Sequence, residues 1–292
     1  MRPPVLPIIH PMTAPEPAAR DTQYIEELVE RALALPVGDP ASLLRVAELC
    51  DLTSSTPQLL ALESSHDEAY AALLLRAANS AASYSATRVA DLPSAITRLG
   101  YQRVAALALA SPGLRMLQGP HDGLEAARHE LHRHAIRVGL AARALAPAGV
   151  DHERALAAGL LHNLGLNVIA ANAPDELRYL LEADSRGEQF WEAEDWIFGF
   201  SHADLGALLA ERWSYPLDLV VAIRDHDSPT PQTPLGALVQ VADVLVRRLG
   251  VGIEPDRELP RQPLLPGLDL EAAAERVAEL VAAQDRFDAA TV

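Results

Sequence analysis

The chain has 292 residues, of which 49% are hydrophobic, 22% are charged and 4% are aromatic. These proportions are those of an ordinary globular protein. Because aromatic residues are so few, the core must be built from Leu, Ala, Val and Ile, and this composition favours close-packed helices over sheets. The formal net charge of −16 would repel a phosphate backbone, so we expect no nucleic-acid partner.

The only cysteine, Cys50, lies in an apolar stretch, and we expect a small core residue rather than a nucleophile. A single cysteine also leaves the chain without a disulfide framework. The first residues lack the basic and apolar regions of a signal peptide. No window approaches about 18 uninterrupted apolar residues, so we expect a cytoplasmic protein with no membrane-spanning helix.

The first half of the chain is expected to hold a tail and a lobe of short helices. Residues 1–20 are rich in proline, which indicates a disordered tail. Residues 21–120 have the pattern of an N-terminal helical lobe. In this lobe, the pair Thr56-Pro57 is typical of a helix start. The sequence Ser111-Pro112-Gly113 predicts the end of a helix that begins at Tyr101.

Residues 121–250 are expected to form a second helical lobe. One of its helices is predicted from Asp151 to Ala171, where Gly159 and Gly165 mark positions at which backbones or ligands can come close. Residues 251–292 are expected to form a proline-rich connector and a C-terminal amphipathic helix that packs on the body. The other predicted helices of the second lobe cover residues 125–146, 201–213, 216–226 and 235–249.

Asn79 and the three tryptophans have structural roles in our interpretation. Asn79 ends a helix, where an Asn caps the backbone or crosses to a neighbouring segment. Trp191, Trp196 and Trp213 are expected to be packing anchors between helices. Base-stacking platforms would not suit so acidic a surface.

Two polar residues of the second lobe interrupt apolar helical runs. His162 lies among leucines, and Asp243 lies in the run from Leu238 to Leu245. A buried carboxylate is costly unless it is paired or coordinated, so Asp243 needs a partner such as an imidazole or a metal ion. Glu130 and His134 are four residues apart and therefore lie on one helix face.

Blocks of sequence in both lobes resemble a known family. The first lobe contains LLLRAANSA at residues 73–81 and AITRLG at residues 95–100, and the second contains AGLLHNLG at residues 158–165 and SHADLG at residues 201–206. In order and spacing these blocks resemble the HDOD family, a divergent branch of the HD-domain superfamily in bacterial signalling proteins. The resemblance implies a two-lobed all-α architecture, with an N-terminal helical lobe and a C-terminal HD-like helical bundle.

The resemblance also implies a site for a divalent metal. His134, His162 and Asp243 match three ligands of the catalytic HD superfamily, and Asn163 stands where that superfamily has an Asp. Imidazole and carboxylate ligands suit Fe, Mn or Zn.

The related HD-GYP phosphodiesterases hold a metal pair with further ligands. Glu130, His202 and His226 match that pattern, whereas Asp227 replaces a usual His. The implied metal site therefore consists of Glu130, His134, His162, Asn163, His202, His226, Asp227 and Asp243.

Two departures from the active enzymes weigh against catalysis. Asn163 is neutral, so it bridges two cations poorly. Leu166 occupies the position of a lysine that would stabilise the phosphate in the transition state. The same histidines could also satisfy one another in a hydrogen-bonded network without a metal.

These observations leave three hypotheses for function. The preferred one is a regulatory protein that acts through signalling proteins or a nucleotide-type ligand. The second is a metal-dependent phosphohydrolase with an altered ligand set. The third is metal binding without catalysis, in which the ion is a structural staple or a sensor input.

Overall fold

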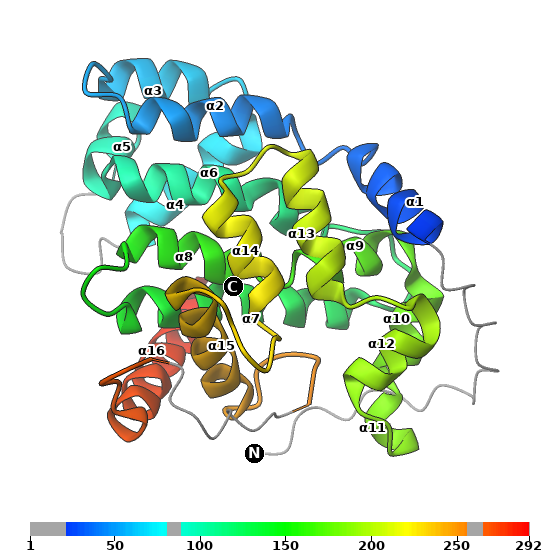
Figure 1. Ribbon diagram of the computed structural model, residues 1–292. Helices are drawn as coiled ribbons and strands as arrows, with labels where there is room; N and C mark the ends of the chain where they lie inside the picture. The colour runs from blue at the N-terminus through cyan, green and yellow to red at the C-terminus, as the bar shows by residue number, and fades with distance from the viewer. Residues whose placement is uncertain (1–21, 81–88, 256–264, 292) are drawn as a thin grey trace. The chain divides into compact units, whose positions relative to one another are not determined.

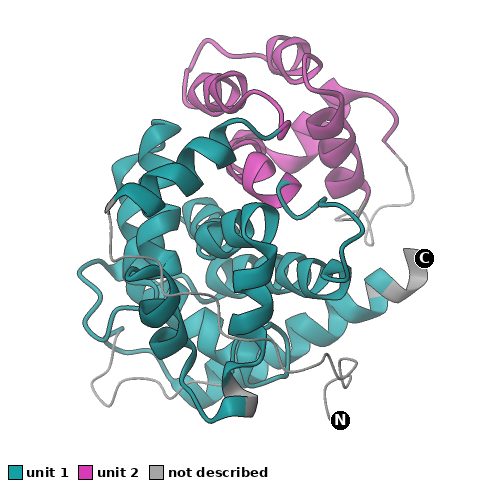
Figure 2. Cartoon of the chain, turned by 90° about the vertical axis from the view of Figure 1, so that its right-hand side faces the viewer, with its two compact units in different colours: residues 1–35, 116–292 teal, residues 36–115 magenta. Residues whose placement is uncertain are grey.

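The computed structural model describes residues 22–80, 89–255 and 265–291, and every regular element within these ranges is an α-helix. The predicted all-α fold class is therefore confirmed. The chain divides into two compact units (Figure 2). Unit 2 comprises residues 36–115, and unit 1 comprises the residues on either side of it. The expected tail of residues 1–20 lies outside the described residues.

Unit 2 begins three of its helices with the same capping arrangement. The side chains of Asp39, Thr56 and Asp91 each accept a hydrogen bond from a backbone N–H of the first turn. A proline then occupies one of the first two helical positions, where its missing N–H costs nothing. The helix start predicted at Thr56 is thus confirmed. The helices of unit 2 are α2 (Pro40–Cys50), α3 (Pro57–Ser64), α4 (Glu68–Ser80), α5 (Leu92–Leu99) and α6 (Tyr101–Arg115).

Helix α6 continues past its predicted end. The prediction that Ser111-Pro112-Gly113 stops the helix was wrong, because Pro112 lies inside α6 and these three residues are buried. The additional turn is stabilised at Arg115, whose guanidinium donates two hydrogen bonds of 2.7 and 2.8 Å to the carboxylate of Asp67. Burial and this ion pair offset the loss of one helical hydrogen bond at the proline.

Two side chains of unit 2 have the structural roles expected of them. The Asn79 amide donates to the carbonyls of Leu75 and Val89 and accepts from the Val89 N–H, with all three bonds 2.9 Å long. It therefore crosses from the end of α4 to the next described segment. Cys50 is 5% exposed, and burial raises the pKa of its thiol to about 12. This protonated core thiol is no nucleophile.

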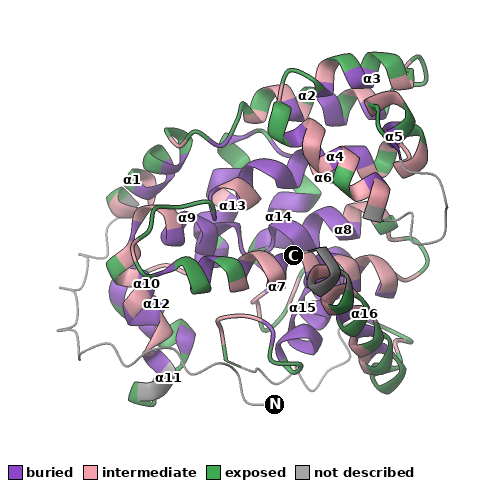
Figure 3. Ribbon diagram, turned by 180° about the vertical axis from the view of Figure 1, so that it is seen from behind, coloured by how far each residue is buried: buried purple, intermediate pink, exposed green. Residues whose placement is uncertain are grey.

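Unit 1 places six helices around the candidate site (Figure 1). Helix α7 packs against α8 and α15, while α13 packs against α9 and α14. Helices α9 and α15 are buried along most of their length, and α8 is buried from Ala155 onward (Figure 3). The six are α7 (Glu125–Leu145), α8 (His152–Leu161), α9 (Leu164–Asn172), α13 (His202–Arg212), α14 (Leu217–Asp225) and α15 (Pro234–Arg247). The unit also contains α1 (Thr22–Leu33), α10 (Pro174–Leu181), α11 (Ala183–Arg186), α12 (Phe190–Phe198) and α16 (Leu270–Thr291).

The helix predicted from Asp151 to Ala171 is divided into α8 and α9. Asn163 has φ −93° and ψ 27°, which interrupts the helical path at its own position. The side chain of His162 simultaneously bonds the carbonyl of Gly159 at 2.7 Å, three residues earlier. This local bond replaces a backbone bond at the interruption and fixes the imidazole ring.

Both glycines singled out in this segment lie at close backbone contacts, as predicted. A Cβ atom on Gly159 would lie 2.7 Å from the Cα of Gly139 in α7. A Cβ atom on Gly165 would lie 1.9 Å from the carbonyl oxygen of His202. The missing side chains let α8 approach α7 and let α9 approach the start of α13.

Helix α1 belongs to unit 1, although the sequence placed it in the lobe of residues 21–120. It packs on α9 and α13. Its Tyr24 hydroxyl donates a 3.0 Å hydrogen bond to Glu176 of α10. Apolar periodicity identified the helix but not the surface against which it packs.

The tryptophans do not all serve as packing anchors. Trp213 is 6% exposed and confirms the expectation, whereas Trp191 and Trp196 are 63% and 54% exposed. These two lie on the outer face of α12, whose opposite face carries the buried residues Phe190 and Glu194. In this short helix the buried residues recur at a spacing of three or four, because only one face is turned toward the protein. The two tryptophans fall outside that spacing.

One described segment is long and apolar enough to cross a membrane. The stretch His152–Asn172 meets that test by length and composition, contrary to the expectation that no segment would. However, 89% of its most apolar window is buried inside the protein. Core helices reach the same hydropathy, so this composition is explained by burial in unit 1.

Candidate metal centre

Four buried histidines from different helices of unit 1 meet in one cluster. His134 lies on α7, His162 joins α8 to α9, His202 begins α13 and His226 follows α14. All four are at most 1% exposed. Neighbouring rings have centroids 5.0–5.2 Å apart, in the order 134, 162, 226, 202. The structure therefore brings together the four histidines that the sequence singled out.

The Nδ1 atom of each imidazole faces a hydrogen-bond acceptor. For His134 this acceptor is the Val251 carbonyl at 2.9 Å, and for His202 it is the Glu194 carboxylate at 2.7 Å. His162 and His226 each bond the carbonyl three residues earlier, at 2.7 and 2.6 Å. An Nδ1 atom that faces an acceptor must carry the proton. The lone pair of a neutral ring is then on Nε2, which points into the cluster.

The Nε2 atoms face one another in two pairs. Those of His134 and His162 are 3.2 Å apart, and those of His202 and His226 are also 3.2 Å apart. Two Nε2 lone pairs at this distance repel unless a proton or a metal ion lies between or beside them. Each pair is therefore a position for a cation.

A carboxylate completes each pair and makes two triads. Triad A comprises His134, His162 and Asp243, and the Asp243 Oδ1 atom lies 2.9 and 3.7 Å from the two Nε2 atoms. Triad B comprises His202, His226 and Asp227, with Asp227 Oδ2 3.6 Å from His202 Nε2. The ligand atoms of each triad lie within 4.8 Å of one another. The buried Asp243 therefore has imidazole partners, as its apolar surroundings required.

A buried arginine contacts the carboxylates of both triads. Arg247 donates from Nε to Asp243 Oδ1 at 2.9 Å, and its Nη2 lies 2.6 Å from Asp243 Oδ2. The same Nη2 is 3.8 Å from Asp227, while Nη1 is 2.9 Å from Glu254. Burial would raise the pKa of Asp243, but the charge of Arg247 and the adjacent imidazoles of His134 and His162 hold it well below its usual range. Asp243 is therefore ionised.

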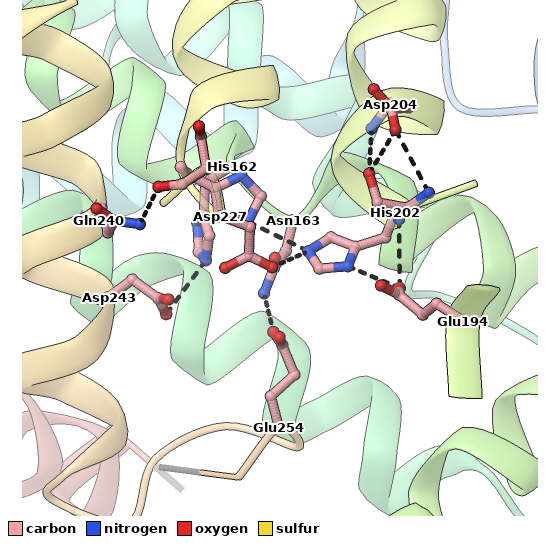
Figure 4. Close-up of polar contacts among 12 residues, drawn as sticks. His162, Asn163, Glu194, His202, Asp204, Asp227, Gln240, Asp243 and Glu254 are labelled. Atoms are coloured by element: carbon pink, nitrogen blue, oxygen red, sulfur yellow. Dashed lines mark hydrogen bonds and ion pairs between the residues drawn. The ribbon is translucent and has the colours of Figure 1, made fainter. Parts of the chain in front are cut away.

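Asn163 also belongs to this cluster (Figure 4). Its amide nitrogen donates to Glu254 Oε1 at 3.2 Å, which fixes the amide orientation. Its Oδ1 atom is buried and has no hydrogen-bond partner within the described residues. A buried carbonyl oxygen without a donor is costly, and a metal ion or a metal-bound water would satisfy it.

The two histidines of triad B have opposite proton affinities. Burial alone would lower the pKa of His202, but the charge and hydrogen bond of Glu194 outweigh it and raise the pKa to about 10. Burial lowers the pKa of His226 to about 3. Without a metal, the additional proton of this pair therefore belongs to His202, whose Nε2 atom faces His226 Nε2. Burial lowers the pKa of His162 in triad A as well.

Glu130 lies outside both triads. Its Oε1 atom accepts from the Gly252 N–H at 2.9 Å, and its Oε2 atom accepts from Arg133 at 2.7 Å. Gly252 in turn lies against the ring of His134. Glu130 therefore supports the loop that holds His134, and the remaining seven residues of the implied metal site lie in the cluster.

Sequence reasoning missed three charged residues of the site: Glu194, Arg247 and Glu254. Arg247 could have been identified from the sequence, because it lies four residues after Asp243 and thus on the same face of α15. Glu194 stands on the short α12 and Glu254 in a non-helical connector. Neither position has a periodicity that marks it as buried.

The residues present fit a divalent transition metal. The donor atoms are imidazole nitrogens and carboxylate oxygens, which suit Zn, Fe and Mn. The Glu194 carboxylate behind His202 and the carbonyls behind the other rings are the supports that metal-bound histidines have. The unpartnered Asn163 Oδ1 adds a further oxygen to the same cluster.

Comparison with known proteins identifies the family. The sequence profile of the HDOD domain matches residues 37–229. The chain belongs to the HDOD domain family. This match confirms the resemblance recognised in the sequence blocks. An uncharacterized protein of Treponema pallidum (strain Nichols) is 33% identical over 210 residues, which are 68% of this HDOD chain and 40% of that relative. The chain thus spans less than half the length of the relative.

Three solved structures share the HDOD fold. An HDOD domain protein of unknown function from Geobacter sulfurreducens has a TM-score of 0.72 and 22% identity, covering 91% of this chain and 98% of its own. A proposed phosphohydrolase from Shewanella amazonensis SB2B has a TM-score of 0.67 and 25% identity, with coverages of 87% and 93%. A proposed signal transduction protein from Marinobacter aquaeolei VT8 has a TM-score of 0.71 and 23% identity, with coverages of 91% and 64%.

Proposed function

We propose that this chain is a regulatory HDOD protein of signal transduction that binds a divalent transition metal and hydrolyses phosphodiesters slowly or not at all. Its output would pass to a signalling protein, and a nucleotide-type ligand is the small molecule we favour as input. The name of the Marinobacter aquaeolei neighbour is in keeping with a signalling role.

The proposal of a metal depends on the paired Nε2 atoms. Two pairs of buried imidazoles face each other at 3.2 Å, with each Nδ1 atom held by an acceptor. A cation relieves the repulsion that this arrangement creates, and a carboxylate stands beside each pair to hold it. A hydrogen-bonded network of neutral polar side chains, in which each donor meets an acceptor, would not need a cation to balance it.

Three features argue against efficient hydrolysis. Asn163 adds no charge to the site. Leu166 is fully buried, so it presents no group to a substrate phosphate. Arg247 is a cation, but both of its contacts with Asp243 and its contact with Glu254 hold it inside the cluster. A bound metal would supply a Lewis acid and an activated water, whereas the chain lacks the lysine expected beside the phosphate.

A second candidate is a metal-dependent phosphohydrolase with an altered ligand set. The donor set of both triads favours it, and so does the name of the Shewanella amazonensis neighbour. In this case Asn163 Oδ1 would bind the metal or its water in place of a carboxylate.

Metal content tests the common part of both proposals. Protein purified from medium supplemented with Fe, Mn and Zn should retain metal in elemental analysis, and a chelator should lower its melting temperature. The matched control is His129→Ala on α7, outside both triads, which should bind metal as the wild type does. Protein with no metal and an unchanged melting temperature would refute the metal site.

Turnover separates the two candidates. We expect no metal-dependent hydrolysis of cyclic dinucleotides or of a generic aryl phosphodiester by the metal-loaded protein. Hydrolysis that disappears in His162→Ala but persists in His129→Ala would establish the phosphohydrolase and reject the purely regulatory role.

A further inference from the structure

Unit 1 contains a hollow whose lining shares no residue with the histidine cluster. It lies between the C-terminal part of α7, the first residue of α8 and the middle of α16, and its volume is about 640 Å³. Clefts of about 300–1,000 Å³ are typical of sites for small molecules. This hollow, called the α16 hollow below, therefore has room for a molecule much larger than an inorganic ion.

Three donors for an anion line the α16 hollow in an otherwise acidic chain. Arg276 of α16 has no ion-pair partner among the described residues. Arg143 of α7 donates from Nε to Glu153 at 2.5 Å, which leaves its Nη groups as further donors. The Nδ1 atom of His152 bonds the Arg143 carbonyl at 2.8 Å, so its ring is fixed and Nε2 is left for a ligand. Two guanidinium groups with planar sets of donors suit the oxygens of a phosphate.

The rest of the lining suits the uncharged part of such a ligand. Leu280 and Ala283 of α16 give the hollow an apolar side. An apolar surface beside a few placed polar groups is the usual composition of a small-molecule site. The carboxylate of Glu279 also lines the hollow and can accept hydrogen bonds from the hydroxyl groups of a ribose or the amino group of a base. The same carboxylate disfavours a ligand that carries negative charge alone.

Helix α16 is attached to α7 by ion pairs close to this hollow. Arg137 of α7 is 2% exposed and pairs with Asp285 and Asp288 of α16, the second at 2.8 Å. Arg133 of α7 lies 3.3 Å from Asp285 and 2.7 Å from Glu130, which holds the loop beside the histidine cluster. A ligand that contacts both α7 and α16 therefore stabilises a helix pair that is connected to the cluster.

From these observations we infer that the α16 hollow binds a small nucleotide. Its phosphate lies at Arg143, His152 and Arg276, and its ribose and base lie beside Glu279 and Leu280. This inference rests on the nucleotide-type input of the proposed function and gives that input a site of its own. Because the site is separate from both triads, binding here needs no metal ion.

Calorimetric titration of the full-length protein with AMP, GMP, CMP and UMP tests this inference. EDTA in the buffer keeps any ion in the triads from attracting the phosphate. We expect one site per chain for at least one of the four nucleotides. The corresponding nucleoside and inorganic phosphate should each bind at least about tenfold more weakly, because each makes only part of the contacts. A nucleoside that binds as tightly as its nucleotide would overturn the role of the arginines.

Exposed residues of α16 provide variants that leave the core untouched. Arg276→Met should weaken nucleotide binding by about tenfold, since it removes a charged hydrogen-bond donor. The matched control is Arg286→Met, which removes the same charge from an exposed position of the same helix outside the hollow and should bind as the wild type does. Ala283→Trp should abolish binding, because it fills the hollow without a change of charge. Equal weakening in both arginine variants would show a general effect of charge and reject the site.

The outcomes distinguish this inference from the proposed function. Nucleotide binding that persists in Arg276→Met and Ala283→Trp would lie elsewhere, which rejects the hollow as the site and keeps the nucleotide as input. No binding of any of the four nucleotides would reject both the hollow and the nucleotide input, whereas the separate metal analysis would still decide metal binding. Binding that the wild type and Arg286→Met show and the two hollow variants lose would support both.

Discussion

The two compact units of this HDOD chain handle buried charge in different ways. Unit 2 has a half-buried ion pair, Asp67 with Arg115, near a helix end, and its Asn79 bonds backbone groups. Unit 1 encloses four imidazoles, several carboxylates and Arg247. In unit 2 these polar groups have hydrogen-bond partners within the unit. In unit 1 they face one another in pairs that require a cation, so its stability depends on protonation or metal.

The chain offers separate probes for the two units. All three tryptophans lie in unit 1, so selectively excited tryptophan fluorescence reports on that unit. The only cysteine, Cys50, is buried in unit 2, so its reaction with a thiol reagent reports the opening of unit 2. The predictions below use this pair of probes to test whether the two units respond independently.

The largest effect is expected for Asp243→Ala. Removing one partner of a buried charge pair leaves Arg247 with only part of its compensating charge, which should cost about 3–5 kcal/mol of unfolding free energy. Urea denaturation followed by tryptophan fluorescence measures the loss, while the labelling rate of Cys50 in native buffer should stay unchanged. The control is Asp218→Ala, which removes a half-exposed surface pair with Arg154 and should change stability by less than about 0.5 kcal/mol. An equal loss in both variants would contradict the special role of the cluster.

Metal addition should stabilise unit 1 only. At a free concentration of about 100 times the dissociation constant, an ion that binds only the folded state adds about 2.7 kcal/mol. The fluorescence-detected melting temperature should therefore rise, and a chelator should reverse the change. Cys50 labelling should not respond. A response of both probes to the same degree would show that the units unfold together.

The sequence predicted different features of unit 2 and of the histidine cluster. Caps such as Thr56-Pro57 act on the next few residues, so the helix start was readable directly. The end of α6 was not, because its continuation through Pro112 depends on burial and on the distant partner Asp67.

In unit 1 the structure brings most of the motif residues together, and His162 and Asp243 stood out in the sequence because they interrupt apolar runs. The charge balance among them could not be predicted in the same way. Glu254 lies in a connector without periodicity, and Glu194 reaches His202 only once α12 and α13 are placed together. Glu130 matched the ligand pattern, but its carboxylate is engaged by Gly252 and Arg133.

Asn79→Ala should affect the Cys50 probe of unit 2 and leave the tryptophan probe of unit 1 unchanged, which is the reverse of the result expected for Asp243→Ala. The variant removes three hydrogen bonds, two of which hold Val89, and should cost about 2 kcal/mol. Cys50 labelling should accelerate, whereas the fluorescence-detected transition should not move. Gln102→Ala serves as the control, because it removes a long exposed hydrogen bond of 3.4 Å to Asp51. Faster labelling in the control as well would show that the assay reports surface changes rather than the Asn79 bonds.

The smallest expected effect is the acid sensitivity of unit 2. Burial would raise the pKa of Asp67, but the hydrogen bonds and charge of Arg115 outweigh it and lower the pKa from its ordinary value of 3.8. Because the folded-state pKa is depressed, the pair stabilises unit 2 fully above pH 3.8 and progressively less as the pH falls through the lowered value. Labelling of Cys50 with a reagent that remains active in acid should therefore accelerate over that range. Asp67→Asn should label faster already at neutral pH, with a cost of about 1 kcal/mol, and should lose this part of the pH dependence. An unchanged acid response in Asp67→Asn would assign the sensitivity to other carboxylates of the unit.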